Sequence, residues 1–179
     1  MVPEAPPERT EHGLAAAGDG WFVLNAREAR WRERPKRGFS LPFEGSTEFP
    51  QVGIALYVLP PGEPIGMYHW EANQEDFLVL FGEALLLIEG EERPLEQWDF
   101  VHCPIGANHM IVGAGDTPCV VLAVGAREHR KGGTWGGYPV DELARRHGVS
   151  AEEETSDAGK AYARFADPFP TRYRDGWLP

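Results

Sequence analysis

The strongest constraint on the fold is a series of short apolar runs, each bounded by turn residues. The runs are rich in Val, Ile, Leu and Phe, and Gly, Pro or acidic residues separate them. Evenly spaced short strands with turn signals between them are typical of an all-β sandwich or barrel. The runs are 52–59, 76–92 (two strands joined at 81–83), 98–104, 109–115 and 119–126.

The 179 residues suit one domain with appendages. Residues 1–20 are rich in Pro, Glu, Gly and Ala, which predicts a disordered lead-in. Residues 21–126 hold the predicted strands. Residues 127–179 change character, and we expect a C-terminal extension with short helices that packs on the barrel or on a partner subunit. Within it, "YPVDELARRHG" has the start and stop signals of a short helix.

Some strands lack the alternation expected when one face meets water. The run from Leu85 to Ile88 is apolar at every position. Continuous apolar runs are typical of strands that are covered on both faces. A second subunit would provide such a cover, so we expect a homodimer.

Composition excludes several classes of protein. The formal net charge of −11 argues against a nucleic-acid partner, which would need a basic footprint. No apolar run approaches the roughly 20 residues that span a bilayer, and the N-terminal segment has no apolar core of the signal-peptide kind. We therefore expect a cytoplasmic protein with no membrane partner. Cys103 and Cys119 are then expected to be free thiols in the core.

One segment departs from the acidic balance. Residues 27–38, "REARWRERPKRG", contain six basic and two acidic residues. Basic runs without a motif are usually solvated surface segments, and we interpret this one in that way.

The stretch "MYHWEANQEDFLVLFGE", residues 67–83, places polar side chains directly before an apolar run. Polar groups that enter a buried strand must be satisfied, by a metal ion, by a hydrogen-bond network, or by water in a loop. On a strand, His69 and Glu71 would face the same side, about 6.6 Å apart at a typical strand rise. Glu75 follows a predicted turn at 72–74, and a hairpin would return it to His69.

His109 is the fourth candidate, because it opens a strand after the turn at Pro104–Gly106. His102 is its competitor, and alternation places His102 on the face opposite Val101 and Cys103. The sequence does not say which of these faces points inward. His69, Glu71, Glu75 and His109 could hold a metal ion or form a metal-free hydrogen-bonded network.

The region from Gly62 to Gly113 resembles the two motifs of the cupin superfamily. The first family motif runs Gly, five residues, His-x-His, three or four residues, Glu, six residues, Gly. The second runs Gly, five residues, Pro-x-Gly, two residues, His, three residues, Asn. This chain supplies Gly62, His69-x-Glu71, Glu75 and Gly82 for the first motif, and Trp98, Pro104-x-Gly106, His109 and Gly113 for the second.

The resemblance implies a double-stranded β-helix, which is a jelly-roll cupin barrel, here with a short C-terminal helical extension. It also implies one divalent metal ion per chain, held by His69, Glu75 and His109. Glu71 stands where the family has its second histidine and corresponds by position only. Gln74, beside Glu75, could replace it as a ligand or bind substrate. Two histidines with one or two carboxylates suit Fe, Mn, Ni or Zn.

Three functions are compatible with these residues. The first is a metal-dependent enzyme on a small-molecule metabolite, with dioxygenase- or isomerase-like chemistry and Glu71 or Gln74 as base or substrate ligand. The second is a non-catalytic cupin that binds a sugar-like molecule in its barrel. The third is a structural dimer with a vestigial site. Fold alone does not choose among them, because cupins carry many chemistries.

Overall fold

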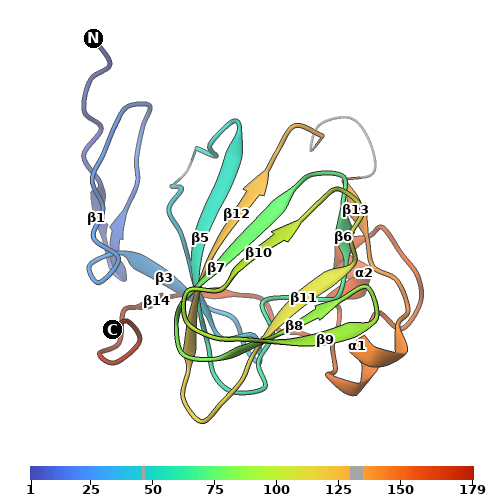
Figure 1. Ribbon diagram of the computed structural model, residues 1–179. Coiled ribbons are helices and arrows are strands. Elements are labelled where there is room, and N and C mark those ends of the chain that lie inside the picture. Colours follow the sequence, from blue (N-terminus) through green and yellow to red (C-terminus); the bar gives the residue numbers. More distant parts are fainter. Residues whose placement is uncertain (46, 130–134) are drawn as a thin grey trace.

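The computed structural model describes residues 1–45, 47–129 and 135–179 (Figure 1). Most of its regular structure is β-strand, and the two helices are short. The strands before the C-terminal region are β1 (Glu8–Thr10), β2 (Gly13–Ala15), β3 (Arg30–Glu33), β4 (Phe39–Pro42), β5 (Val52–Leu59), β6 (Trp70–Glu71), β7 (Glu75–Phe81), β8 (Ala84–Ile88), β9 (Glu91–Leu95), β10 (Phe100–Cys103), β11 (His109–Gly113) and β12 (Cys119–Ala126). The C-terminal elements are β13 (Gly136–Gly137), α1 (Glu142–Arg146), α2 (Ala158–Ala161) and β14 (Phe169–Arg172).

The described strands form two main sheets and two small ones. The larger sheet has seven antiparallel strands in the order β10-β7-β12-β5-β4-β3-β14, and the second has the order β11-β8-β9. The small pairs are β1-β2 and β13-β6. The chain crosses from the larger sheet to the second at the turn between β7 and β8, where Gly82 has a φ of 76°. This is the jelly-roll arrangement, and it confirms the predicted all-β double-stranded β-helix.

The main core lies between the two large sheets. Phe77, Val79 and Val121 point inward from the seven-stranded sheet and meet Leu86 and Ile111 of the three-stranded one. The sequence alternation on β7 and β10 is that of strands with one face on this core. The predicted strands therefore lie close to the observed ones, and 52–59 and 119–126 match β5 and β12 residue for residue.

The second face of β8 is covered by the chain's own C-terminal extension. Leu86 faces the main core, whereas Leu87 packs with Leu143 and Ala144 of α1 and with Val149 just beyond it. Asp141 caps α1, since its side chain accepts from the Ala144 amide. The inference that a partner subunit covers this strand is therefore corrected, and the homodimer stays a prediction without that support.

Segments near the two ends of the chain lie beside β3 of the larger sheet (Figure 1). The segment 1–20, expected to be a disordered lead-in, contains the hairpin β1-β2. At the other end, β14 pairs with β3, so the tail lies on the chain's own sheet. Trp177 follows and contacts the rings of Trp31 and Phe39 at centroid distances of 5.2 and 4.1 Å. The boundaries of the three predicted segments stay predictions.

Two further expectations concern cysteines and helices. Cys103 and Cys119 are both free and buried, in agreement with the prediction, and burial raises the pKa of the Cys119 thiol to about 11. No helix in the described part of the chain is long and apolar enough to cross a membrane.

The tail should contribute measurably to stability through Trp177. We expect Trp177→Ala to lower the free energy of unfolding by about 2–3 kcal/mol, because a half-buried indole would be lost from a cluster around the buried Trp31. Urea unfolding followed by fluorescence measures it. Trp98→Ala is the matched control, since Trp98 is 67% exposed and its loss should change stability by no more than about 0.5 kcal/mol. Equal effects of both substitutions would contradict this account of the tail.

Candidate metal centre

The candidate ligands come from three segments of the chain, each next to or within a different β-sheet. His69 lies just before β6 and forms an isolated antiparallel bridge with His109, the first residue of β11. Glu75 is the first residue of β7 in the larger sheet. The predicted return of Glu75 to His69 is confirmed, but not through a hairpin, because β6 pairs with β13 of the C-terminal extension. The centre therefore sits where three sheets meet.

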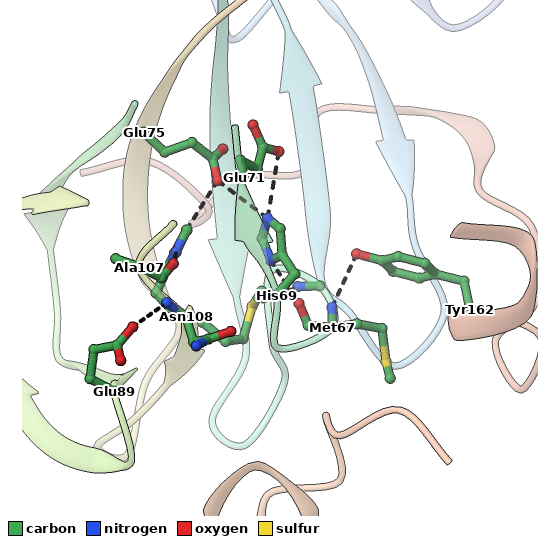
Figure 2. A network of polar contacts seen from close by, with 11 residues as sticks. Met67, His69, Glu71, Glu75, Glu89, Ala107, Asn108 and Tyr162 are labelled. Carbon is green, nitrogen blue, oxygen red and sulfur yellow. Dashed lines mark hydrogen bonds and ion pairs between the residues drawn. The ribbon is translucent and has the colours of Figure 1, made fainter. Parts of the chain in front are cut away.

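The donor atoms of the cluster converge on one point (Figure 2). Glu75 Oε2 lies 3.0 Å from His109 Nε2 and 3.3 Å from His69 Nε2. Ligands about 2.1 Å from one ion lie about 3.0–3.4 Å apart at octahedral or tetrahedral angles. One donor atom from each of these three residues lies within 4.8 Å of the other two. The arrangement fits the two-histidine, one-carboxylate set that suits a divalent transition metal.

Backbone carbonyls orient both imidazoles. His69 Nδ1 lies 2.9 Å from the Met67 carbonyl, and His109 Nδ1 lies 2.9 Å from the Ala107 carbonyl. A carbonyl can only accept, so each Nδ1 carries the proton and donates it. In a neutral ring this leaves the Nε2 lone pair free for a metal ion, and such hydrogen bonds are typical of metal-binding histidines. The chain thus supplies both the ligands and the groups that fix their orientation.

The C-terminal extension supports the His69 segment from behind. Tyr162, the C-cap residue of α2, accepts a hydrogen bond from the Met67 amide at 3.0 Å (Figure 2). The ring of Tyr138 lies 5.9 Å from that of His69, with an angle of 30° between the two planes. A residue with a side chain at Gly66 would place its Cβ 2.5 Å from the Tyr162 hydroxyl, so only glycine permits this close approach. Sequence reasoning missed these contacts because more than 60 residues separate the partners.

Burial and hydrogen bonding act in opposite directions on the charges of the cluster. Burial disfavours the imidazolium of His69, but hydrogen bonds to Glu71 and Glu75 outweigh it and raise the pKa of His69 to about 9. Burial also acts against charge on His109, whereas Cys103 and Glu75 raise its pKa to about 9. For Glu75, burial is again outweighed, and the two histidines lower the pKa of its carboxyl. Without a metal ion, these groups form a charged network.

The remaining predicted residues occupy different places. Glu71 lies beside the cluster, with Oε1 3.5 Å from His69 Nε2, but it is outside the three-residue group (Figure 2). Gln74 is exposed, and its amide donates to Asp76, so the structure does not bring it to the centre. His102 is exposed and also pairs with Asp76, whereas its neighbour Cys103 points into the core. The structure thus places His109 rather than His102 at the cluster.

A cavity of about 650 Å³ opens from the carboxylate side of the cluster. Glu71 and Glu75 line it, together with polar and aromatic residues that sequence reasoning did not select. Arg127 and Glu44 form a bidentate ion pair in its wall across 83 residues of chain, a separation that leaves no local signal. These additional lining residues are Glu44, Tyr57, Asn73, Arg127 and Trp135.

Two departures from the family motifs have structural explanations. Trp98 stands at the first glycine of the second motif and keeps the left-handed conformation that glycine favours, with a φ of 79°. Gly113 stands at the asparagine of that motif. A Cβ at this position would lie 2.3 Å from the Pro60 carbonyl oxygen, so the close approach of that turn excludes a larger residue. Trp98 and Gly113 therefore align with the glycine and asparagine positions of the family's second motif, and only the residue types differ.

Comparison with known proteins agrees with this geometry. Residues 55–125 match the family described as the cupin domain. This segment of the chain is a cupin domain. The matched segment contains His69 and His109, together with Glu71 and Glu75, whereas α1, α2 and the tail lie outside it.

Several cupins resemble this chain over part of their length. An oxalate-binding protein from Thermotoga maritima is 32% identical over 71 residues, which are 40% of this chain and 59% of that protein. The solved structure of a sugar phosphate isomerase from Silicibacter pomeroyi, of the cupin superfamily, is 29% identical, with 50% of this chain and 59% of that one covered and a TM-score of 0.45. An RmlC-like cupin family protein from Methanocaldococcus jannaschii, with a double-stranded β-helix fold, is 21% identical, with 45% and 73% covered and a TM-score of 0.41. The chain spans less than two thirds of the first two relatives.

The histidine pKa values predict how stability depends on pH once metal is removed. Imidazoles with a pKa of about 9 in the folded state and 6.5 in the unfolded state stabilise the fold fully below pH 6.5, and this stabilisation is lost as the pH rises through 9. Urea unfolding in chelator between pH 6 and 9.5 should therefore show falling stability. Glu75→Gln should flatten the decline, because it removes the carboxylate that both imidazoliums share. If the stability of Glu75→Gln declines with pH as steeply as that of the wild-type protein, the raised pKa values of the two histidines do not depend on the Glu75 carboxylate.

Proposed function

We propose that this cupin binds one divalent metal ion through His69, Glu75 and His109 and acts on a small-molecule metabolite in the barrel cavity. The convergence of two Nε2 atoms on one carboxylate oxygen, with both Nδ1 atoms tied to carbonyls, carries the proposal. Fe, Mn, Ni and Zn all suit this ligand set. When bound, such an ion supplies a Lewis acid at the inner end of the cavity.

Glu71 is the residue we assign to chemistry on the ligand. Its side chain is 18% exposed, lines the cavity, and lies 3.5 Å from His69. A carboxylate at the edge of the cluster can accept a proton from a bound molecule without occupying the position of a metal ligand. This favours proton-transfer chemistry of the isomerase kind over a role for Gln74, whose side chain points to Asp76. Dioxygenase-like chemistry stays compatible with the three-residue ligand set.

Binding without turnover is the second candidate, and one observation favours it. The Thermotoga maritima relative, 32% identical over 71 residues, is described as an oxalate-binding protein. A small anion held at the ion alone would require none of the chemistry assigned to Glu71. Two carboxylates beside a divalent ion leave the centre neutral, which weakens its attraction for such an anion.

A cytoplasmic location and a homodimer also stay predictions.

Metal content tests the centre directly. We expect about one transition-metal ion per chain after anaerobic purification without chelator, and loss of most of it in His69→Ala and His109→Ala, because each variant removes one of three ligands. Elemental analysis by mass spectrometry measures this. Gln74→Ala is the control at an exposed neighbouring position and should retain the metal. Protein without any transition metal would overturn the proposal.

Glu71→Gln separates the two roles of the carboxylates. We expect this variant to retain the metal, because Glu71 is outside the three-ligand group. If the protein is an isomerase, turnover should fall about 100-fold or more with little change in ligand affinity, since only the proton acceptor is lost. Loss of the metal in Glu71→Gln would instead identify Glu71 as a ligand. A panel of sugar phosphates and small organic acids tests the alternative. If the wild-type protein and Glu71→Gln bind a compound with equal affinity and the wild-type protein turns over none of the panel, the binding function is favoured.

A further inference from the structure

A second cavity lies outside the barrel, between the β3-β4 turn and α2. Its volume is about 680 Å³. Arg34 and Arg37 line one side, and the other side is formed by residues 158–159, 162–163 and 165–168 in and after α2. Both arginines belong to the basic segment 27–38, which the sequence alone suggested was solvated surface. We call this cavity the arginine pocket.

Arg37 is held in the arginine pocket by aromatic rings rather than by acids. Its side chain is only 6% exposed, and its guanidinium lies over the rings of Tyr162 and Phe165 at 5.0 and 4.8 Å. One Nη atom makes a long hydrogen bond of 3.4 Å to the Ala166 carbonyl. The Nε atom is buried and has no protein partner within the described chain. A buried guanidinium N–H without an acceptor is costly, and an anion can supply the missing acceptor through a strong charge-assisted hydrogen bond.

Arg34 repeats the same features beside it. Its guanidinium lies over the ring of Tyr57 at 5.2 Å, and one Nη donates to the Ile65 carbonyl. The other Nη is buried and lacks a protein partner among the residues that the structure describes. Each guanidinium therefore keeps one unsatisfied N–H, and both side chains line the arginine pocket. Planar guanidiniums held against aromatic faces present their edges to a ligand, which suits the recognition of oxyanions.

The charges around the arginine pocket are unbalanced. Burial and the nearby Arg34 both lower the pKa of Arg37. Asp167 lines the pocket and raises that pKa in turn, but it is exposed and forms no ion pair with Arg34 or Arg37 in the described structure. Across a chain of net charge −11, other arginines such as Arg127 and Arg174 do pair with carboxylates. The pocket thus keeps two positive charges without a paired carboxylate.

We propose that the arginine pocket binds a phosphate-type dianion, either inorganic phosphate or the phosphate group of a small molecule. Two guanidiniums that line one cavity balance a charge near −2, and guanidinium N–H groups suit the oxygens of a tetrahedral oxyanion. The site is separate from the metal centre, although Ala158 lines both cavities and Tyr57 contributes to the wall between them. The proposal does not depend on the metal, so the two can fail independently.

Isothermal titration of the full chain with inorganic phosphate at pH 7.5 and constant ionic strength tests the proposal. We expect one phosphate per chain, bound with equal affinity by chelator-treated and metal-loaded protein. Arg34→Gln and Arg37→Gln should each weaken binding by about 10-fold or more, as expected for loss of a charged hydrogen-bond donor. Arg32→Gln is the matched control, because it removes the same charge from an exposed position on β3. Its affinity should stay within about twofold of wild type.

A thermal shift provides a second readout that does not depend on activity. Phosphate should raise the Tm of the wild-type protein and of Arg32→Gln, but not that of Arg34→Gln, because only a bound ligand stabilises the folded state. If Arg37→Gln does not fold, Arg34→Gln alone decides the question. Any one of the following results would overturn the proposal: no binding at about 10 mM phosphate, equal weakening by Arg32→Gln, or binding that occurs only in metal-loaded protein. Acetate, a monoanion, should bind at least tenfold more weakly, and equal affinity for acetate would also overturn it.

Discussion

The centre of this protein is organised around the carboxylate of Glu75, which contacts both histidines from the start of β7. Each partner comes from a different part of the barrel, since His109 opens β11 in the second sheet and His69 precedes β6. The contact therefore links the sheets at the point where the jelly roll opens into its cavity. A buried carboxylate beside two buried imidazoles needs a balancing positive charge, which either the protonated imidazoles or a bound metal cation can provide. The same requirement explains why the surrounding backbone is arranged to hold each ring.

The C-terminal extension has a structural role in this arrangement. The α1 helix covers the outer face of β8 and β11, which explains why those strands are apolar on both sides. Tyr162, at the end of α2, supports the Met67 backbone and also stacks against Arg37. One residue therefore contacts both the metal-centre segment and the arginine pocket. This dual contact makes the extension, which lies outside the segment that matches the cupin domain, part of both proposed sites.

Much of the barrel and the ligand set could be predicted from the sequence, for physical reasons that are local. Strand positions follow from alternation and from glycine and proline turns, and most predicted boundaries agree with the structure to within a few residues. His69 and Glu75 lie six residues apart, and motif spacing adds His109 to them. What failed also has local causes. Gln74 is adjacent to Glu75, but alternation turns neighbouring side chains to opposite faces, and Gln74 points to Asp76. The arginines were interpreted as surface residues because a basic run does not show what covers it.

An all-β cupin barrel with a histidine and carboxylate cluster could be predicted from the sequence, because alternation, turns and motif spacing are properties of short segments. The packing of distant segments places Glu71 at the edge of the cluster, turns Gln74 toward Asp76 and lays α1 over β8. It also decided that Arg34 and Arg37 enter a pocket beside α2. These outcomes depend on which elements, distant in the chain, pack together. That packing is set by the total burial of apolar surface and not by any single segment.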